Sequence, residues 1–211
     1  MITTPTAVRE YDRTAPPGAE TETATFGLGC FWGPDAQFGA MDGVVRTRVG
    51  YAGGTKTDPS YHALGDHTEV FQVDYDPDRR SYADLLDLAF RSHDPDQQTQ
   101  RTQYQNVVFS RTPEQEDTLR SFLADRDLAP DEIGTRIEEL GRFYPAESYH
   151  QKYNLKADAS LLAPFEEADY DEAAIRESPA AAKLNGHATG KDLPEKAADR
   201  LLVRRRDGRQ S

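Results

Sequence analysis

The sequence predicts an α+β fold, a two-layer sandwich in which helices pack on a mainly antiparallel sheet. Short segments alternate apolar and polar residues, as half-buried strands do, and the stretches between them place apolar residues at the spacing of one helix face. The predicted order is strand, helix, two strands, helix, strand, followed by a further helix and strand. This order is typical of a split βαβ (ferredoxin-like) core.

The predicted strands end at turn signals. The strand over residues 44–52 runs into Gly53-Gly54, and the strand over residues 67–75 stops at Asp76-Pro77. Three further strands are expected over residues 23–28, 105–110 and 135–140.

The predicted helices carry start signals. A helix that begins at Ser81 has Asp84 in the position of a capping-box acid, and its apolar residues share one face. Those apolar residues are Tyr82, Leu85, Leu86, Ala89 and Phe90. Thr112-Pro113 marks another helix start, with proline at the first helical position. A shorter helix is expected over residues 34–40.

The composition divides the chain into three parts. Residues 1–22 are rich in Thr, Pro, Glu and Ala without an apolar period, and we expect a mobile arm. Residues 23–160 are expected to form a compact domain. Residues 161–211 form an acidic, alanine-rich extension that ends in the basic run Arg204-Arg205-Arg206. We expect this extension to be partly disordered, with order up to about Asp171.

Charge and hydropathy exclude several classes of function. A formal net charge of −12 argues against binding to nucleic acid or an anionic membrane, because both require a cationic surface. No stretch of about 18 apolar residues could span a bilayer, and the N-terminus lacks the pattern of a secretory signal. A single cysteine fits a reducing cytoplasm. The 37 acidic residues fit either a hydrated surface suited to a salt-rich cytoplasm or an ordinary acidic protein.

The only cysteine, Cys30, lies in the run Gly29-Cys30-Phe31-Trp32-Gly33, between a predicted strand and a predicted helix. A thiol at such a turn faces the unpaired N–H groups and the positive dipole end of the helix, which would lower its pKa and make it a nucleophile. The alternative is a buried cysteine that acts as a small apolar residue.

The five histidines do not show the spacing of a metal site, so neither a metal nor another cofactor is expected. A Cys–His hydrolase dyad would pair Cys30 with His67 or His93, but no further motif supports it.

Several segments resemble, in order, the motifs of the A-class peptide methionine sulfoxide reductases. The first is the Gly-Cys-Phe-Trp-Gly run at residues 29–33. The others lie at residues 49–54, 58–61, 67–70, 75–77, 93–95, 102–104 and 143–153. The resemblance makes residues 23–160 the catalytic domain and implies the reduction of methionine S-sulfoxide, free or in proteins, to methionine.

This reduction requires a thiolate that attacks sulfur and an acid that protonates the oxygen. Cys30 is the only possible thiolate. By resemblance Glu69 is the acid, kept protonated by a partly apolar pocket that raises its pKa. The strand pattern alone would make Glu69 a solvent-facing residue.

The resemblance also implies substrate-binding residues. Tyr61 and Tyr104 match tyrosines whose hydroxyls bind the sulfoxide oxygen, and Phe31 and Trp32 would form the apolar wall that receives the S-methyl group. Without the resemblance, core packing would explain these four side chains equally well.

The chain departs from the family pattern in three places. Residues 96–101 replace a longer loop that in many relatives holds a supporting aspartate, so Asp94 or Asp96 would have to substitute. Asp35 stands where the family usually has Glu. No second cysteine exists to resolve a Cys30 sulfenic acid, so an external thiol, either thioredoxin or a small molecule, must reduce it.

A rival hypothesis is a sulfoxide-binding or peroxide-sensing thiol module that the shortened loop has weakened as a catalyst. The number of turnovers distinguishes the two hypotheses. An enzyme releases many methionine molecules per Cys30, whereas a sensor releases at most about one.

Overall fold

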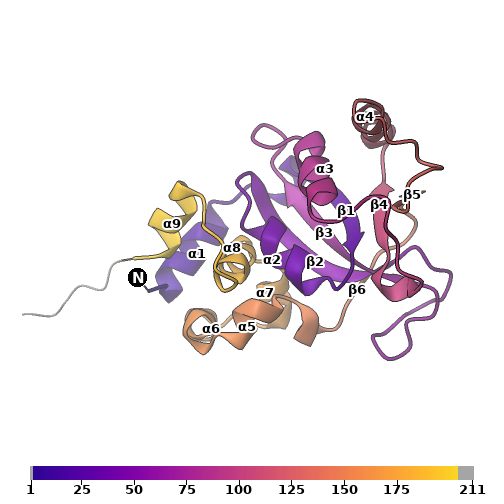
Figure 1. Cartoon of the computed structure of the whole chain (residues 1–211). Helices are drawn as coiled ribbons and strands as arrows, with labels where there is room; N and C mark the ends of the chain where they lie inside the picture. The colour runs from indigo at the N-terminus through magenta and orange to yellow at the C-terminus, as the bar shows by residue number, and fades with distance from the viewer. Residues whose placement is uncertain (1, 204–211) are drawn as a thin grey trace, which may run out of the picture.

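A six-stranded sheet forms the centre of the computed structural model, which describes residues 2–203 (Figure 1). The strands are β1 (Glu22–Leu28), β2 (Val44–Ala52), β3 (Thr68–Tyr75), β4 (Asn106–Ser110), β5 (Arg136–Glu139) and β6 (Tyr144–Pro145). Their order is β5-β4-β1-β3-β2-β6, and every neighbouring pair is antiparallel except β4 and β5.

The predicted split βαβ core is confirmed. Helix α2 (Trp32–Gly39) connects β1 to β2, and α3 (Tyr82–Arg91) connects β3 to β4. Strand β3 lies between β1 and β2 and runs antiparallel to both. Helix α4 (Pro113–Ala124) follows β4. This connectivity brings the ends of β1 and β2 and the starts of β3 and β4 to one edge of the sheet.

Local sequence signals explain where the core helices begin. The Ser81 side chain accepts a hydrogen bond from the Asp84 N–H while Asp84 bonds back to Ser81, so the predicted capping box is present. Thr112 caps α4 just before Pro113. The apolar faces of α2 and α3 then pack on the sheet in a cluster that includes Phe26, Phe38, Phe71, Leu85 and Leu86.

The expectation of a mobile N-terminal arm is wrong for most of its length. Helix α1 (Pro5–Arg13) starts at a Thr4 cap, and Val8 is fully buried. Ile2 pairs with Val203 at the other end of the chain. The segments that order this arm therefore lie about 170 to 200 residues away in the sequence, where no local apolar pattern could reveal them.

The expectation of disorder beyond Asp171 is also wrong over the part of the extension that the structure describes. The segment after β6 contains α5 (Tyr153–Ala157), α6 (Ala159–Glu166), α7 (Glu172–Glu177), α8 (Pro179–His187) and α9 (Glu195–Leu201). The basic run Arg204-Arg205-Arg206 lies outside the described residues.

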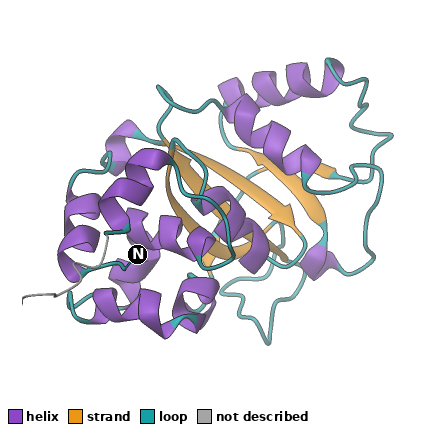
Figure 2. Ribbon diagram, turned by 60° about the vertical axis from the view of Figure 1, so that its left-hand side comes forward, coloured by secondary structure: helices purple, strands orange, loops and turns teal. Residues whose placement is uncertain are grey.

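A second hydrophobic cluster explains this order. Residues from both chain ends form it: Val8, Leu155, Phe165, Ile175, Ala180, Ala181, Leu184, Leu201 and Leu202. Figure 2 shows the helices of the two ends gathered together beside the strands. We call this group of helices, α1 and α5–α9, the terminal module.

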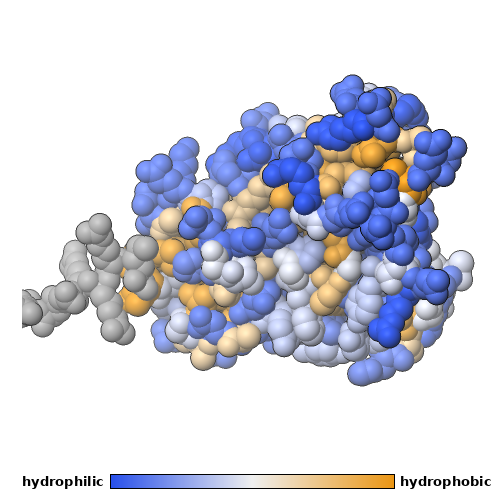
Figure 3. All heavy atoms as spheres, in the orientation of Figure 1, coloured by the Kyte–Doolittle hydropathy of each residue, from blue (hydrophilic) through white to orange (hydrophobic). Residues whose placement is uncertain are grey.

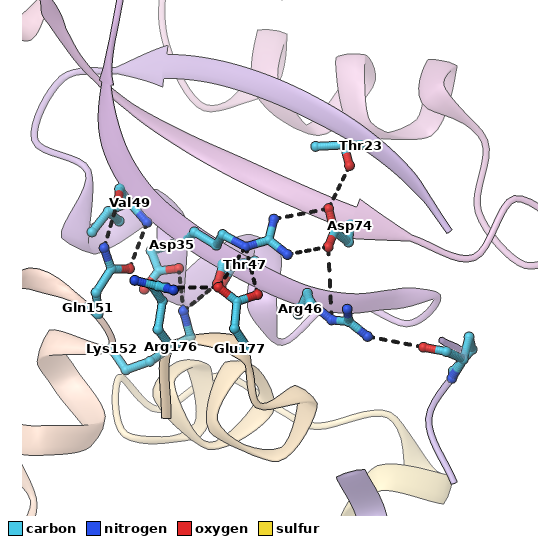
Figure 4. A network of polar contacts seen from close by, with 12 residues as sticks. Thr23, Asp35, Arg46, Thr47, Val49, Asp74, Gln151, Lys152, Arg176 and Glu177 are labelled. Atoms are coloured by element: carbon cyan, nitrogen blue, oxygen red, sulfur yellow. Dashed lines mark hydrogen bonds and ion pairs between the residues drawn. The ribbon is translucent and has the colours of Figure 1, made fainter. Parts of the chain in front are cut away.

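A partly buried ion pair bonds the terminal module to the sheet (Figure 4). Arg48 on β2 contacts Asp74 on β3 at 2.6 Å and Glu177 at the end of α7 at 2.9 Å. The Gln151 amide pairs with the backbone of Val49, donating to its carbonyl at 2.8 Å and accepting from its N–H at 3.0 Å. Polar groups at the edge of β2 are thus satisfied by residues that precede or belong to the terminal module.

The outer surface fits the acidic composition. The face drawn in Figure 3 is mainly hydrophilic. Within residues 2–203, no helix combines the length and apolar character needed to cross a bilayer.

Close contact between α2 and α8 gives a test of how the terminal module docks. A Cβ on Gly39 would lie 2.5 Å from the Ala182 carbonyl oxygen, whereas a Cβ on Gly33, in the same helix, would meet open space. We expect Gly39→Ala to lower the free energy of unfolding by about 1–3 kcal/mol through overpacking.

The matched substitution Gly33→Ala should leave that free energy unchanged or raise it by roughly 0.5–1 kcal/mol, because it removes backbone freedom from the unfolded chain. Chemical denaturation measures both values. Equal effects at the two glycines would contradict the close packing of α2 against α8.

Candidate functional site

The candidate site lies at the sheet edge where β1 and β2 end and β3 begins. Cys30 follows β1, Tyr51 lies at the end of β2, and Glu69 is the second residue of β3. Tyr51 and Glu69 are directly opposite in the β2–β3 register. The topology, rather than proximity in sequence, therefore brings these three side chains together.

Cys30 is exposed at the turn between β1 and α2, as an attacking thiol must be. Gly29 adopts a φ of 73°, a left-handed conformation that favours glycine and allows the chain to turn directly into the helix. Partial burial of the sulfur raises the pKa of Cys30, the Trp32 N–H lowers it, and the charge of Glu69 raises it further. The net rise contradicts the expected lowering, because burial and the neighbouring carboxylate outweigh the backbone N–H.

Glu69 is buried, with 1% of its surface exposed, so the strand pattern misjudged its environment. Its carboxylate accepts hydrogen bonds from the Phe31 N–H at 3.2 Å and from the Gln103 amide at 2.7 Å. Burial raises the pKa of Glu69, and the two hydrogen bonds act in the opposite direction. The net effect is a raised pKa, so Glu69 keeps its proton to a higher pH than an exposed glutamate does.

Aromatic side chains surround the thiol and the carboxyl group. Phe31 is 1% exposed and packs against Tyr51 and His150, with ring centroids 6.1 and 5.2 Å away. Trp32 stacks on Tyr153 at 3.8 Å with the rings almost parallel. Phe31 and Trp32 thus form an aromatic wall next to Cys30.

The two predicted tyrosines also lie at this site. Burial raises the pKa of Tyr104, as do the charge of Glu69, the hydroxyl of Tyr61 and, more weakly, Cys30. Tyr61 is half-buried, and its ring lies 4.7 Å from that of His150. Cys30, Glu69, Tyr61 and Tyr104 are therefore neighbours, although they are distant in sequence.

Hydrogen bonds to neighbouring segments hold the shortened loop and the turn that follows it. The Gln98 amide donates to the carbonyls of Asn106 and Gly134 at 2.8 and 3.0 Å. Thr68 donates to the Thr102 carbonyl at 2.9 Å, which holds the 3₁₀ turn Thr102–Tyr104 against the start of β3. Asp94 accepts from the N–H of Asp96 within the loop. Gln103, rather than either aspartate, donates to Glu69.

Sequence reasoning missed four polar residues of the site. They are Tyr51, Gln103, Glu147 and His150. The Glu147 carboxylate accepts from the Tyr51 hydroxyl at 2.7 Å and from the Tyr61 N–H at 2.9 Å, so it positions both tyrosines. All four lie inside the quoted motif segments, but only the fold shows that they converge.

The structure excludes the Cys–His dyad. His67 accepts from the Gly54 N–H and bonds the Lys56 carbonyl, so both ring nitrogens hold the loop before β3. His93 bonds Ala89 and Thr135 in the same way. The described part of the chain contains no cluster of three His, Cys, Asp or Glu side chains that could hold a metal ion.

An exposed thiol beside a buried carboxyl group, walled by aromatic rings, is the arrangement of a thiol-dependent redox site. Comparison with known proteins agrees with this class. The family model described as "Peptide methionine sulfoxide reductase" matches residues 22–179. The chain therefore belongs to the peptide methionine sulfoxide reductase family, and it is an oxidoreductase.

Individual relatives support the same assignment. A peptide methionine sulfoxide reductase from Drosophila melanogaster is 42% identical over 171 residues, covering 80% of this chain and 68% of the relative. The solved structure of methionine sulfoxide reductase A of Corynebacterium diphtheriae has a TM-score of 0.57 at 34% identity, covering 66% of this chain and 76% of that one. Reduced Mxr1 from Saccharomyces cerevisiae gives 0.56 at 29% identity, with coverages of 69% and 91%.

The charge coupling between Glu69 and Cys30 predicts an effect on the thiol itself. Glu69→Gln removes the negative charge that raises the pKa of Cys30, so we expect that pKa to fall. The pH dependence of Cys30 alkylation by iodoacetamide measures the shift.

Glu22→Gln is the control, because Glu22 lies at the opposite end of β1. It should leave the alkylation profile of Cys30 unchanged. An unchanged profile in Glu69→Gln as well would show that the two groups are not coupled.

Proposed function

We propose that this chain reduces the S epimer of methionine sulfoxide to methionine, with Cys30 as nucleophile and Glu69 as general acid. One observation carries the assignment of roles. The N–H of Phe31, the residue next to Cys30, donates to the buried Glu69 carboxylate, so the thiol and the proton donor share one site. The stereochemical preference rests on membership of the family.

The proposed step balances two electrons, one proton and one oxygen. The Cys30 thiolate attacks the sulfoxide sulfur, and protonated Glu69 gives its proton to the sulfoxide oxygen. The S–O bond and the transient bond between the two sulfur atoms then break as the hydroxyl passes to Cys30, which becomes a sulfenic acid. The substrate sulfur is thereby reduced to the thioether of methionine, and the cysteine sulfur is oxidised by the same two electrons.

The tyrosines act on the same oxygen. A raised pKa keeps Tyr104 protonated, so its hydroxyl can donate to the sulfoxide oxygen. The N–H of Tyr61 is anchored on Glu147, which holds its ring beside the site. Phe31 and Trp32 offer the apolar surface for the S-methyl group.

An external thiol completes the cycle. Cys30 is the only cysteine, so no intramolecular disulfide can resolve its sulfenic acid. A first external thiol displaces water and forms a mixed disulfide with Cys30, and a second releases the cysteine as a thiol. A dithiol protein such as thioredoxin, or two small-molecule thiols, would serve. All electrons come from thiols, so the cycle needs no prosthetic group, and it suits a reducing compartment such as the cytoplasm.

Steady-state kinetics tests this proposal. With excess dithiothreitol, a peptide that contains methionine S-sulfoxide should give many methionines per protein, and the R epimer none. Cys30→Ser should abolish the reaction, and Glu69→Gln should slow it by about 10²- to 10⁴-fold, the usual range for a lost general acid.

The sensor hypothesis makes the opposite prediction. A yield of at most one methionine per protein would contradict the proposed reductase function. If the thiol still oxidises readily, that result would support a sensing module. Glu22→Gln, which removes a carboxylate far from the thiol, should react at the wild-type rate.

A hydroxyl deletion tests the role of the tyrosines. We expect Tyr104→Phe to lower the rate of reduction by about 10²- to 10³-fold, the usual loss when one donor to a developing charge is removed, with little change in KM. Tyr170→Phe removes a hydroxyl that bonds Asp12 in the terminal module and should leave the rate unchanged. A wild-type rate in Tyr104→Phe would remove Tyr104 from the mechanism.

A further inference from the structure

Helix α2, which begins two residues after Cys30, is held at both ends by one other helix, α8. We propose that α8 is a positioning element of the active site, and that Asn185 in particular sets the reactivity of Cys30 through Asp35. This inference rests on the proposed role of Cys30 and Glu69.

Asn185 fixes the first turn of α2. Asp35 lies in that turn and is 1% exposed, and its carboxylate accepts from the Asn185 amide at 2.9 Å. The Lys152 ammonium lies 3.4 Å from the other carboxylate oxygen and donates to the Thr47 carbonyl at 2.6 Å (Figure 4). Asn185 is fully buried and also accepts from the Leu155 N–H at 3.0 Å.

A continuous series of hydrogen bonds joins Asn185 to the site. Asn185 donates to Asp35, whose N–H donates to the Phe31 carbonyl at 3.0 Å. The Phe31 N–H donates in turn to Glu69 at 3.2 Å. A displacement of Asp35 therefore moves Phe31, whose N–H belongs to the peptide bond with Cys30 and faces the proposed acid.

Lys183 fixes the opposite end of α2. Its ammonium donates to the carbonyls of Gly39, Met41 and Val44 at 2.8, 2.7 and 2.6 Å. Three acceptors match the three N–H bonds of an ammonium. Together with the close approach at Gly39, these contacts prevent α2 from sliding or rotating against the sheet.

The α8 residues in these contacts, Lys183 and Asn185, lie outside the part of the chain that the family model covers. That model ends at residue 179, where α8 begins. The terminal module thus contributes to the site through residues that family membership does not assign.

Two substitutions test the proposal, one that replaces an amide side chain by a carboxylate and one that replaces a carboxylate by an amide. Asn185→Asp keeps the shape of the side chain but places a second carboxylate against Asp35, in place of the donated hydrogen bond. Asp12→Asn is the matched control, because Asp12 anchors the start of α8 by accepting from Ser178 and Ala180 at 2.6 and 2.7 Å, and its side chain bonds Tyr170 rather than α2.

The measurement is the single-turnover rate of methionine formation by pre-reduced protein, at a temperature where thermal melting shows every variant to be folded. We expect Asn185→Asp to lower this rate by on the order of tenfold or more, with substrate affinity within about twofold of wild type, because misplacement of reacting groups lowers the rate rather than binding. Asp12→Asn should lower the melting temperature and leave the rate unchanged.

The double variant Asp35→Asn, Asn185→Asp restores a donor and an acceptor between the two positions, and most of the rate should return. The inference is overturned if folded Asn185→Asp reacts at the wild-type rate, or if the double variant is no faster than Asn185→Asp. If wild-type protein forms no methionine in this assay, the proposed function itself has failed.

Discussion

The position of α2 against the sheet edge is the constraint on which the site depends. The Glu69 carboxyl group is buried, and an unsatisfied buried carboxylate would be costly. The Phe31 N–H supplies one of its two donors, and that N–H is available only because α2 starts where it does. Movement of α2 along its axis would separate Cys30 from the carboxyl group and leave Glu69 with one donor.

Electrostatics at this edge favours a single negative charge. Burial raises the pKa of both Cys30 and Glu69, and the charge of Glu69 raises that of Cys30 further. The two titrations are therefore linked, and the pair resists double ionisation. Among the singly charged states, a thiolate with a protonated carboxyl group contains both reactants that sulfoxide reduction needs. In the proposed mechanism, this state supplies the nucleophile and the acid together.

The terminal module is part of this arrangement rather than an appendage. It bonds to the sheet through Glu177 and Arg48, and to α2 through Asn185 and Lys183. Lys183 is 3% exposed where α8 packs on the end of α2, and this burial lowers its pKa to about 7. Small residues along α8, including Ala182 and Gly186, permit this close approach. The alanine-rich composition that indicated disorder is what allows α8 to be fully buried.

The sequence by itself determined the α+β class, the order of strands and helices, the capping box at Ser81 and the position of the only cysteine. These features depend on local periodicity, local caps and residue type, which are properties of short sequence segments and do not require the tertiary fold. Family motifs added Glu69, Tyr61 and Tyr104, but their roles in catalysis remain part of our proposal.

Only the tertiary structure decided the environments of these groups. The pKa of Cys30 is raised because burial and Glu69 outweigh the helix N–H groups, a balance that no sequence pattern contains. Gln103 and Glu147 became site residues through contacts across more than 30 positions of chain. The ordering of both chain ends likewise depends on packing between segments almost 200 residues apart, because burial of apolar surface is a property of the assembled fold.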